Sequence, residues 1–572
     1  MLGSSIDIYL KNILAKAAET VAARKGKELP TSFAVEIERP RREGQGDRSS
    51  SVAMQLAKPM GLPPRDLAAE IIALLNSGDD EAIGKNDEVV DKVIDKIEIA
   101  GPGFINFFLS DKWLFNVVTE VLNAREYGSS DIGAGRKVQV EFVSANPTGP
   151  LHVGHGRGAA VGDSLASLLA FTGWKVEREY YINDAGLQID ILGRSTQSRY
   201  FELFNRAELA PFPEDGYKGE YIYDLAKDAM AGEKDRFLSV PLSESLPWFK
   251  RFAGDAILAG IKKDLEYFGV RFDVWFSERS LYERNLVPEA MEHLKHRGYA
   301  FESEGAIWFK VSDFEDDDDR VLIRSNGAPT YFASDIAYHK EKFGRGFDKV
   351  IDVWGADHHG YVSRMKAGVE ALGRDSDDLE VLLIQFVNLV RDGVHVPMST
   401  RSGQFVTLRD VVDEVGVDAT RYFFLMRRSD SQLDFDLELA KRASNDNPVY
   451  YVQYAYARIC SIIQELKDRG GEMPGVEKLS LAALEGEEAR KLINCLAIFP
   501  QEIENASKDL APHSITNYAF NLAGYFHSFY NTSRILGESA PIEAGRLLIA
   551  KATQTVLARC LALIGLSAPE RM

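Results

Sequence analysis

The spacing of apolar residues changes twice along the chain, and the first pattern covers residues 1 to about 125. Apolar positions in residues 67–75 recur at helical spacing and predict a helix. Residues 93–99 fit either a strand or a helix, whereas residues 104–109 predict a strand. The turn Gly101-Pro102-Gly103 separates these two segments. We therefore expect an α+β domain over residues 1–125.

A second pattern begins after the Gly- and Ser-containing segment 128–135, which indicates a linker. Residues 137–143 alternate as a strand, a helix of small residues runs from about Gly156 to Phe171, and residues 176–182 predict a second strand. Strand, helix and strand in this order form the βαβ unit of a parallel sheet. Further strands fit residues 350–354 and 381–387. We expect a Rossmann-type parallel-sheet domain over residues 135–409, interrupted by a mostly helical insertion at about 195–300.

The third pattern starts near residue 408, where strand signals fade. Residues 447–466 and 542–564 show long helical periodicity. We expect an all-α C-terminal domain over residues 410–572. The chain as a whole is then a multidomain α/β protein, since 572 residues exceed what one hydrophobic core accommodates.

Composition narrows the class of protein. Hydrophobic residues make up 45% and charged residues 27%, no apolar run approaches a membrane span, and no secretory signal pattern opens the chain. Three cysteines without a Cys-x-x-Cys pair indicate neither a disulfide framework nor a cysteine zinc site. We expect a cytoplasmic protein without a membrane partner or a structural metal. The net charge of -19 argues against a general nucleic-acid coat protein, but a local basic patch can still contact RNA.

Two histidines stand where the first strand gives way to its helix, in the segment Leu151-His152-Val153-Gly154-His155-Gly156. A helix N-terminus offers free N–H groups and partial positive charge, so phosphates bind there. Imidazoles at i and i+3 can hydrogen-bond phosphate oxygens that gain charge as pyrophosphate leaves. Alternatively, both histidines are turn residues or metal ligands. The order strand, Pro/Gly loop, motif and helix favours phosphate chemistry.

This segment resembles the His-x-Gly-His nucleotide-binding element of class I aminoacyl-tRNA synthetases, which other nucleotidyltransferases share. Those synthetases carry a second, lysine-rich loop. The segment that resembles it here is Pro397-Met398-Ser399-Thr400-Arg401-Ser402-Gly403. Pro397 and Thr400 occupy the two usual lysine positions, which leaves the cationic phosphate ligand open; Arg401 is one candidate. The resemblance implies ATP with Mg²⁺ as cofactor and ATP contacts from His152, Gly154, His155, Asp357, His358, Met398, Ser399 and Arg401.

Three further segments resemble the arginyl-tRNA synthetase family in particular. They are Glu141 to Pro150, Tyr331 to Tyr338, and Trp354-Gly355-Ala356-Asp357-His358-His359-Gly360. Arginine is a planar cation with five N–H donors, so its pocket should offer a carboxylate for the guanidinium and a second group for the α-amine. By resemblance, Asp335 and Tyr331 face the guanidinium. Glu141, Ser144 and Asn146 lie near the amino-acid backbone, and His358 or His359 contacts ATP or arginine.

Each of these residues also has a structural interpretation. Glu141 on a central strand fits an ion-pair partner, and Asp335 fits the N-cap of the helix that follows. We favour the pocket because the residues occur together at matching positions. Such a pocket rejects lysine and citrulline, since each leaves buried polar groups unpaired.

The resemblance extends to the tRNA side. Residues 417–423 and 447–458 resemble the helical tRNA-binding region of the family, with candidate contacts at Tyr450, Gln453, Tyr454 and Arg458. Aromatic residues mixed with Gln and Arg suit stacking on splayed bases. A buried helix core is the alternative for these tyrosines. In the N-terminal domain, Phe104 and Asn106 are expected to contact the outer corner of the tRNA, or else to be packed structural residues.

The expected reaction therefore attaches L-arginine to the 3′ end of tRNA(Arg) through arginyl-adenylate, in an enzyme that is a monomer by resemblance. Arginine activation is expected to require bound tRNA. One rival is a class I synthetase for another amino acid. A second is a tRNA-binding paralogue without catalysis, which Pro397 and Thr400 motivate and which the intact His152 and His155 oppose.

Overall fold

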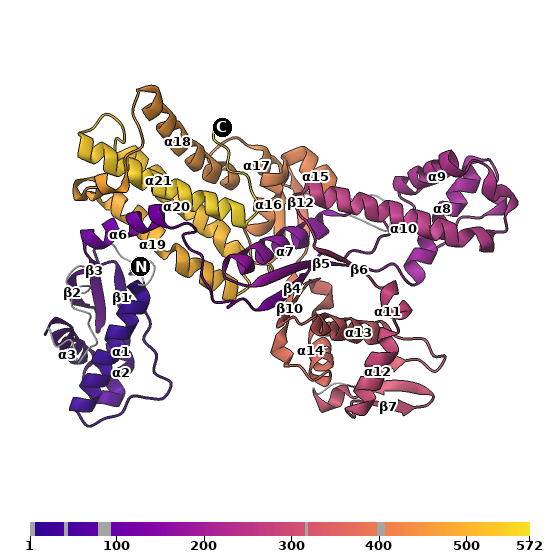
Figure 1. The fold of residues 1–572 in the computed structure, drawn as a ribbon, viewed down its shortest axis with the longest axis horizontal. Helices are drawn as coiled ribbons and strands as arrows, with labels where there is room; N and C mark the ends of the chain where they lie inside the picture. The colour runs from indigo at the N-terminus through magenta and orange to yellow at the C-terminus, as the bar shows by residue number, and fades with distance from the viewer. Residues whose placement is uncertain (1–5, 39, 41–43, 78–92, 315–317, 397–405) are drawn as a thin grey trace.

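The computed structural model describes residues 6–38, 40, 44–77, 93–314, 318–396 and 406–572. The chain forms an N-terminal α+β unit, a central parallel sheet with a helical projection, and a helical bundle over one side of that sheet (Figure 1). This is the predicted fold class. No helix within the described ranges is long and apolar enough to cross a membrane.

The N-terminal unit packs three helices on a small antiparallel sheet. The sheet has the order β1 (Arg48–Ser50), β3 (Phe104–Leu109) and β2 (Ile94–Ala100), so residues 93–99 resolve as a strand. The helices are α1 (Ile6–Arg24), α2 (Val52–Met60) and α3 (Pro64–Asn76).

Helix α6 (Asp111–Asn123) leads from the N-terminal unit to the rest of the chain and contacts helices α19 and α21 of the bundle.

The central sheet contains five parallel strands in the order β11–β10–β4–β5–β6. Their bounds are Leu379–Ile384, Lys349–Gly355, Lys137–Glu141, Lys175–Ile182 and Val274–Ser277. The chain order reverses between β10 and β4, and open α/β sheets bind ligands outside the carboxyl ends of strands at such a switch point. Helix α7 (Val153–Phe171) covers one face, and α13 (Tyr331–Gly344) and α14 (Val362–Ala371) cover the other.

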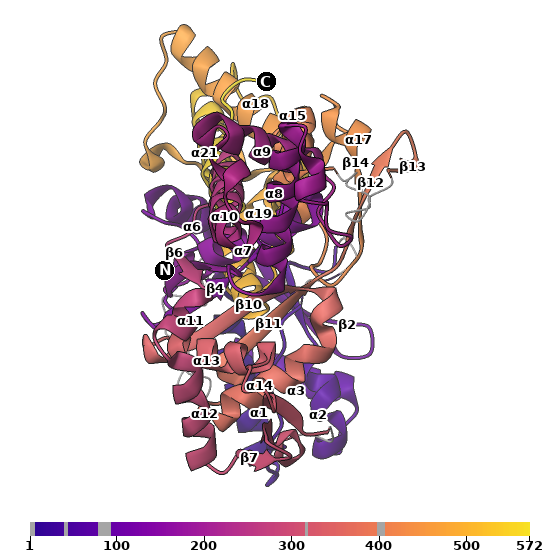
Figure 2. The same ribbon diagram turned by 90° about the vertical axis from the view of Figure 1, so that its right-hand side faces the viewer.

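The helical insertion lies between β5 and β6. It contains α8 (Leu187–Leu203), α9 (Glu220–Glu233) and α10 (Leu242–Tyr267), and it has an apolar cluster of its own around Tyr200 and Phe249. Figure 2 shows these helices in front of the rest of the molecule. The stretch predicted as an insertion, about 195–300, also contains β6 (Val274–Ser277) of the central sheet, with helices before and after it. The sequence prediction missed β6 because a strand of only four residues gives little periodicity.

After β6 come α11 (Arg279–Glu283) and α12 (Leu286–His296). They lead to an antiparallel sheet of β7 (Ala300–Ser303), β8 (Ala306–Phe309) and β9 (Arg320–Ile323).

A separate three-stranded sheet follows the central sheet along the chain. In it, β12 (Val387–Arg391) pairs with β13 (Val394–His395) and with β14 (Leu433–Asp436). Strand pairing therefore extends past residue 409, into the segment where we expected helices alone. Helices α15 (Leu408–Val415), α16 (Val417–Leu425) and α17 (Leu437–Lys441) pack on one another, with α16 against β14 and α17 against β12.

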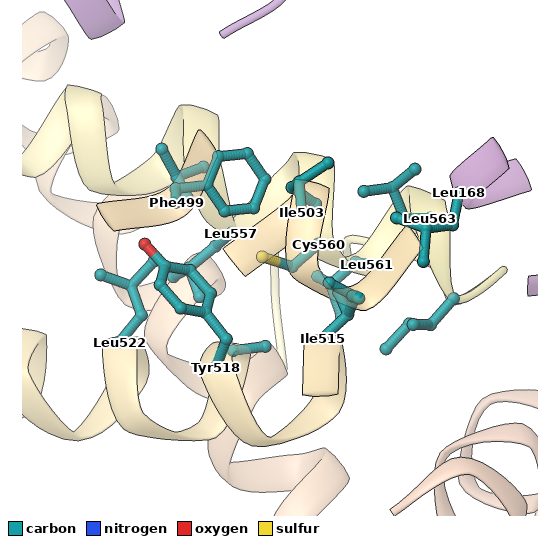
Figure 3. Packing of buried hydrophobic residues seen from close by; sticks show 14 of the residues in the cluster. Leu168, Phe499, Ile503, Ile515, Tyr518, Leu522, Leu557, Cys560, Leu561 and Leu563 are labelled. Atoms are coloured by element: carbon teal, nitrogen blue, oxygen red, sulfur yellow. The ribbon is translucent and has the colours of Figure 1, made fainter. Parts of the chain in front are cut away.

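The C-terminal bundle consists of α18 (Pro448–Asp468), α19 (Glu487–Lys508), α20 (His513–Thr532) and α21 (Ala540–Leu563). Phe499 of α19, Tyr518 of α20 and Leu557 of α21 meet in its core (Figure 3). Leu168 of α7 belongs to the same apolar cluster, so the bundle packs directly on the helix that follows the first strand of the sheet.

Candidate active site

Helix α7 begins at the two histidines of the motif. His152 is the N-cap: its Nδ1 accepts a hydrogen bond from the backbone N–H of Gly154 at 3.1 Å. The backbone N–H of His152 in turn donates to Nδ1 of His155 at 3.3 Å. The two rings stack with centroids 3.6 Å apart. A Cβ on Gly154 would come within 3.0 Å of the His152 ring, which explains the glycine between them.

The charge of both imidazole rings follows from their burial, and the position of the proton on each ring follows from these hydrogen bonds. Burial lowers the pKa of His152, and burial together with His152 lowers the pKa of His155 to about 3, so both rings are neutral at neutral pH in the free protein. Because each Nδ1 accepts a backbone hydrogen bond, each neutral ring carries its proton on Nε2. The helix N-terminus therefore presents two imidazole N–H donors, as a phosphate site requires.

The segment after the predicted second loop lies against this motif. The backbone N–H of Leu408 donates to the carbonyl of Leu151 at 2.8 Å, and His152 forms a β-bridge with Thr407. Pro397, Met398, Ser399, Thr400 and Arg401 themselves lie outside the described residues.

A cavity of about 240 Å³ opens at the carboxyl ends of β4, β5 and β10, next to the switch point. Its lining combines carboxylates with aromatic rings. The residues are Glu141, Val143, Ser144, Tyr181, Asp335, Tyr338, His339, Asp352, Val353, Trp354, Gly355, His358 and Tyr361. Of the residues expected near arginine or ATP, the structure brings Glu141, Ser144, Asp335 and His358 together here.

Asp335 is a half-buried carboxylate on the wall of the cavity, with His339 and Lys342 near enough to act on its charge. Helix α13 begins at Tyr331 with Thr330 as its N-cap, so Asp335 lies beyond the first turn and does not cap the helix. The hydroxyl of Tyr361 donates to Oδ2 of Asp335 at 2.6 Å, and no cation among the described residues forms an ion pair with Asp335. Burial raises the pKa of this carboxyl. A bound cation is what such a group lacks.

The structure leaves other predicted residues outside the cavity. Tyr331 is 66% exposed and does not line it. The amide of Asn146 donates to Oε1 of Gln188 at 2.7 Å, away from the lining. Asp357 and His359 are exposed in the 3₁₀ turn Ala356–Tyr361 and do not line the cavity, whereas His358 and Tyr361 of the same turn do.

The sequence analysis missed Glu278, a buried carboxylate directly after β6. Its exposed fraction is 4%, and burial together with the charges of Asp335 and Asp184 raises its pKa to about 7. The carboxyl-end rule would have indicated Glu278 if β6 had been predicted as a strand. It also missed Tyr181, near the end of β5, and Tyr361, at the end of the 3₁₀ turn after β10, because neither position carries a local sequence signal.

The predicted tRNA contacts differ in how available they are. Tyr450 and Tyr454 are half-buried and stack with centroids 5.7 Å apart.

By contrast, Gln453 is buried, and its amide donates to Oδ2 of Asp418 at 2.7 Å and to the carbonyl of Ser567 at 3.1 Å. Asn106 is also buried and accepts from the Ser49 hydroxyl at 2.7 Å, whereas Phe104 is half-buried. The geometry thus gives Gln453 and Asn106 structural partners.

Arg458 lies between two aromatic rings of the bundle. A guanidinium N–H donates to the Tyr454 hydroxyl at 2.9 Å, and the group lies over the ring of Tyr530 on α20. Tyr530 is 38% exposed and was not predicted as a candidate contact.

A parallel sheet with histidines at the N-terminus of its first helix and a pocket at the switch point fits a class I aminoacyl-tRNA synthetase, and the comparisons with known proteins decide the class. Three family models agree: an arginyl tRNA synthetase N terminal domain matches residues 8–109, a class I (R) tRNA synthetase catalytic domain matches 117–436, and a DALR anticodon binding domain matches 452–572. The chain belongs to the arginyl-tRNA synthetase family.

Individual relatives support this assignment. The chain is 53% identical over 541 residues to a protein named arginine–tRNA ligase from Citrifermentans bemidjiense, covering 94% of this chain and 95% of that one. A solved structure described as a putative arginyl-tRNA synthetase from Campylobacter jejuni is 37% identical, with a TM-score of 0.73, over 81% of this chain and all of that one. The Thermus thermophilus arginyl-tRNA synthetase, 21% identical with a TM-score of 0.75 over 99% of this chain and all of that one, shares the fold.

Proposed function

We propose that the cavity binds arginine and that the neighbouring α7 N-terminus binds ATP. Family membership gives the reaction: the enzyme attaches arginine to the 3′ end of tRNA through arginyl-adenylate. The observation that carries the site assignment is Asp335, a half-buried carboxylate without an ion-pair partner among the described residues, in a cavity at the edge of the sheet where β4 ends and the chain leads to the His152–His155 donors.

In this proposal the two cationic groups of arginine meet two sets of acceptors. The guanidinium binds Asp335, and Glu278 adds a second negative charge nearby, since the charge of Asp335 acts on it. The α-amine binds Glu141, whose Oε1 already accepts from the Ser144 hydroxyl at 2.9 Å. His358 lines the same cavity and is the better candidate of the histidine pair for a substrate contact.

The α7 N-terminus stabilises the charge that develops on the phosphates during adenylate formation. The Nε2–H groups of His152 and His155 donate to phosphate oxygens, and an arriving phosphate favours protonation of both rings. No proton has to leave arginine through a general base, because positioning and charge stabilisation carry the step. Mg²⁺ accompanies ATP, bound mainly through phosphate oxygens; the described residues contain no group of three or more His, Cys, Asp or Glu side chains arranged to hold a metal.

On the tRNA side, the proposal places anticodon bases against the Tyr450 and Tyr454 rings beside Arg458. Phe104 is the corresponding candidate in the N-terminal unit. We further propose a cytoplasmic monomer whose arginine activation depends on bound tRNA. Pyrophosphate exchange with arginine and ATP alone would contradict that dependence.

The direct test charges total tRNA with each labelled amino acid in turn, with ATP and Mg²⁺, beside the variant His155→Ala. We expect incorporation of arginine alone, and its loss in the variant. Incorporation of another amino acid would overturn the arginine pocket. No incorporation of any amino acid, with tRNA binding retained, would favour a non-catalytic tRNA-binding protein.

A further inference from the structure

The α13 face of the central sheet carries a row of three carboxylates. Glu141 on β4 lies in register with Asp352 on β10 and with Glu179 on β5, so the three side chains share one face. Their exposed fractions are 8%, 1% and 0%. Neighbouring strands lie only about 4.8 Å apart, and burial removes the water that would screen like charges. The row therefore depends on cations from the helix above it.

Helix α13 supplies those cations at fixed positions. Arg345 donates to Oε1 of Glu179 at 3.0 Å, and the hydroxyl of Tyr338 donates to the same carboxylate. Lys342, with no exposed surface, lies between the other two members of the row. Its Nζ is 2.6 Å from Oε2 of Glu141 and 2.8 Å from Oδ1 of Asp352.

Lys342 is connected to the arginine cavity without lining it. Glu141 and Asp352 both line the cavity, and Lys342 donates a hydrogen bond to each of them but does not itself line the cavity. His339 continues the connection, since Nε2 lies 2.9 Å from Oδ2 of Asp352 and Nδ1 lies 2.8 Å from the backbone carbonyl of Asp335.

We propose that Lys342 is a positioning residue for arginine, which keeps Glu141 and Asp352 ionised and holds Glu141 toward the cavity without touching the substrate. This inference rests on the proposed arginine pocket. Lys342 holds Oε2 of Glu141 and the Ser144 hydroxyl holds Oε1, so the carboxylate is fixed at both oxygens before arginine arrives.

The charges around the row predict a pH effect. Burial raises the pKa of Glu141, and Lys342 opposes that rise while Asp352 and Glu179 add to it. For Asp352, burial is outweighed by Lys342 and His339, which lower its pKa to about 2. Other charged or titratable groups near the row are Asp335, Tyr338 and His339 on α13, Arg345 at the end of that helix, and Glu177 and Tyr181 on β5. Without Lys342, Glu141 and Asp352 repel each other, so one takes up a proton at a higher pH.

The test measures kcat/KM for arginine between pH 6 and 9 in Lys342→Met, Lys342→Arg and wild-type enzyme, with tRNA charging as the readout. Arginine needs ionised Glu141, so activity is lost as pH falls and this carboxyl takes up a proton, while Glu278 titrates in the same way in all three enzymes. This loss of activity forms the acidic limb of the pH profile. In Lys342→Met we expect the limb to lie at a pH about one unit or more higher than in the wild-type enzyme, with KM for arginine rising more than kcat falls. Lys342→Arg keeps the charge, so its limb stays near the wild-type position.

Two further variants make the result decisive. Lys340→Met, on the same helix but lining a separate shallow hollow with Arg284 and Glu341, should keep the wild-type pH profile. Lys342→Met/Asp352→Asn removes one of the two repelling carboxylates and should return the limb toward lower pH, in a protein whose buried charges are again balanced. A uniform loss of activity at all pH values in both Lys342→Met and this double variant would overturn the inference and leave Lys342 a structural residue. Failure of the wild-type enzyme to charge arginine would instead overturn the proposed function.

Discussion

The two faces of the central sheet are built from the same strands, but one face is apolar and the other carries buried carboxylates. On the α7 face, Val138, Val140 and Phe142 join one apolar cluster with Ile351 and Val353. On the α13 face, alternate residues of the same strands form the carboxylate row and part of the wall of the cavity proposed to bind arginine. The period of two along a strand separates the two sets of residues, except that Val353 near the end of β10 also lines the cavity.

Because of this difference, we expect the α7 face to contribute mainly to the stability of the fold and the α13 face mainly to substrate binding. The α7 face gains free energy by removing apolar surface from water, and α7 approaches so closely that a Cβ on Gly162 would lie 2.3 Å from the Phe142 ring. The α13 face loses free energy by burying charges, and it recovers that loss only where the charges are paired or a cationic substrate is bound. Substitutions on the two faces should therefore act on different measurements.

The largest effect is expected at the N-terminus of α7. His155→Ala removes a donor aimed at developing phosphate charge, so adenylate formation should fall by about 10²-fold or more. Single-turnover formation of arginyl-adenylate with tRNA present measures the step. Affinity for tRNA, determined by filter binding, should stay at the wild-type value. Adenylate formation at the wild-type rate would refute the phosphate role.

On the α13 face, Asp335→Asn should act mainly on arginine. The substitution keeps the shape and the Tyr361 contact but removes the charge that a guanidinium pairs with, so kcat/KM for arginine should fall about 10²-fold. KM for ATP should change little. Equal losses for both substrates would mean that Asp335 supports the site as a whole and does not select the guanidinium.

A smaller, pH-dependent effect is expected at Glu278. Its pKa of about 7 predicts that kcat/KM for arginine rises as pH increases through the neutral range, because the cation favours the ionised carboxylate. Glu278→Gln should remove the part of that rise that Glu278 contributes, leaving the part set by Glu141, and should lower the plateau by about tenfold, roughly one lost charge contact. A profile measured from pH 5.5 to 8.5 checks both features. An unchanged rise in the variant would assign the titration to other groups.

Some features of the two faces could be predicted from the sequence, and others could not. The strand, helix and strand around His152 were predictable because long periodic segments and a helix-capping motif are local signals. The positions of Glu141, Ser144 and Asp335 followed from resemblance. The carboxylate row and Lys342 did not, since the row depends on register between β10, β4 and β5, and Lys342 reaches it from 201 residues away. Glu278 was missed with its short strand.

On the α7 face the expected effect is on stability. Gly162→Ala should destabilise the protein by about 1–3 kcal/mol, because its Cβ overlaps the buried Phe142 ring. Thermal unfolding measures the change, and KM for arginine should not move. Gly158→Ala on the same helix is the control, since no atom lies within 4 Å of its Cβ and alanine favours the helix. Equal melting temperatures for the two variants would contradict the close packing.

The smallest effect is expected outside the sheet, on helix α18. Buried core residues of this helix lie next to Tyr454, a proposed tRNA contact. Tyr454→Ala should weaken tRNA binding by about 1 kcal/mol or somewhat more, the value of stacking one base on an aromatic ring. The stacking is between ring and base, so the salt dependence of binding should keep its slope, because no phosphate contact is lost. Tyr454→Phe keeps the ring and loses only the hydrogen bond from Arg458, so its affinity should lie near wild type. If both variants bind tRNA as tightly as wild type, the stacked pair Tyr450–Tyr454 belongs to the packing of the bundle and the anticodon bases bind elsewhere, with the exposed ring of Tyr530 on α20 as the next candidate.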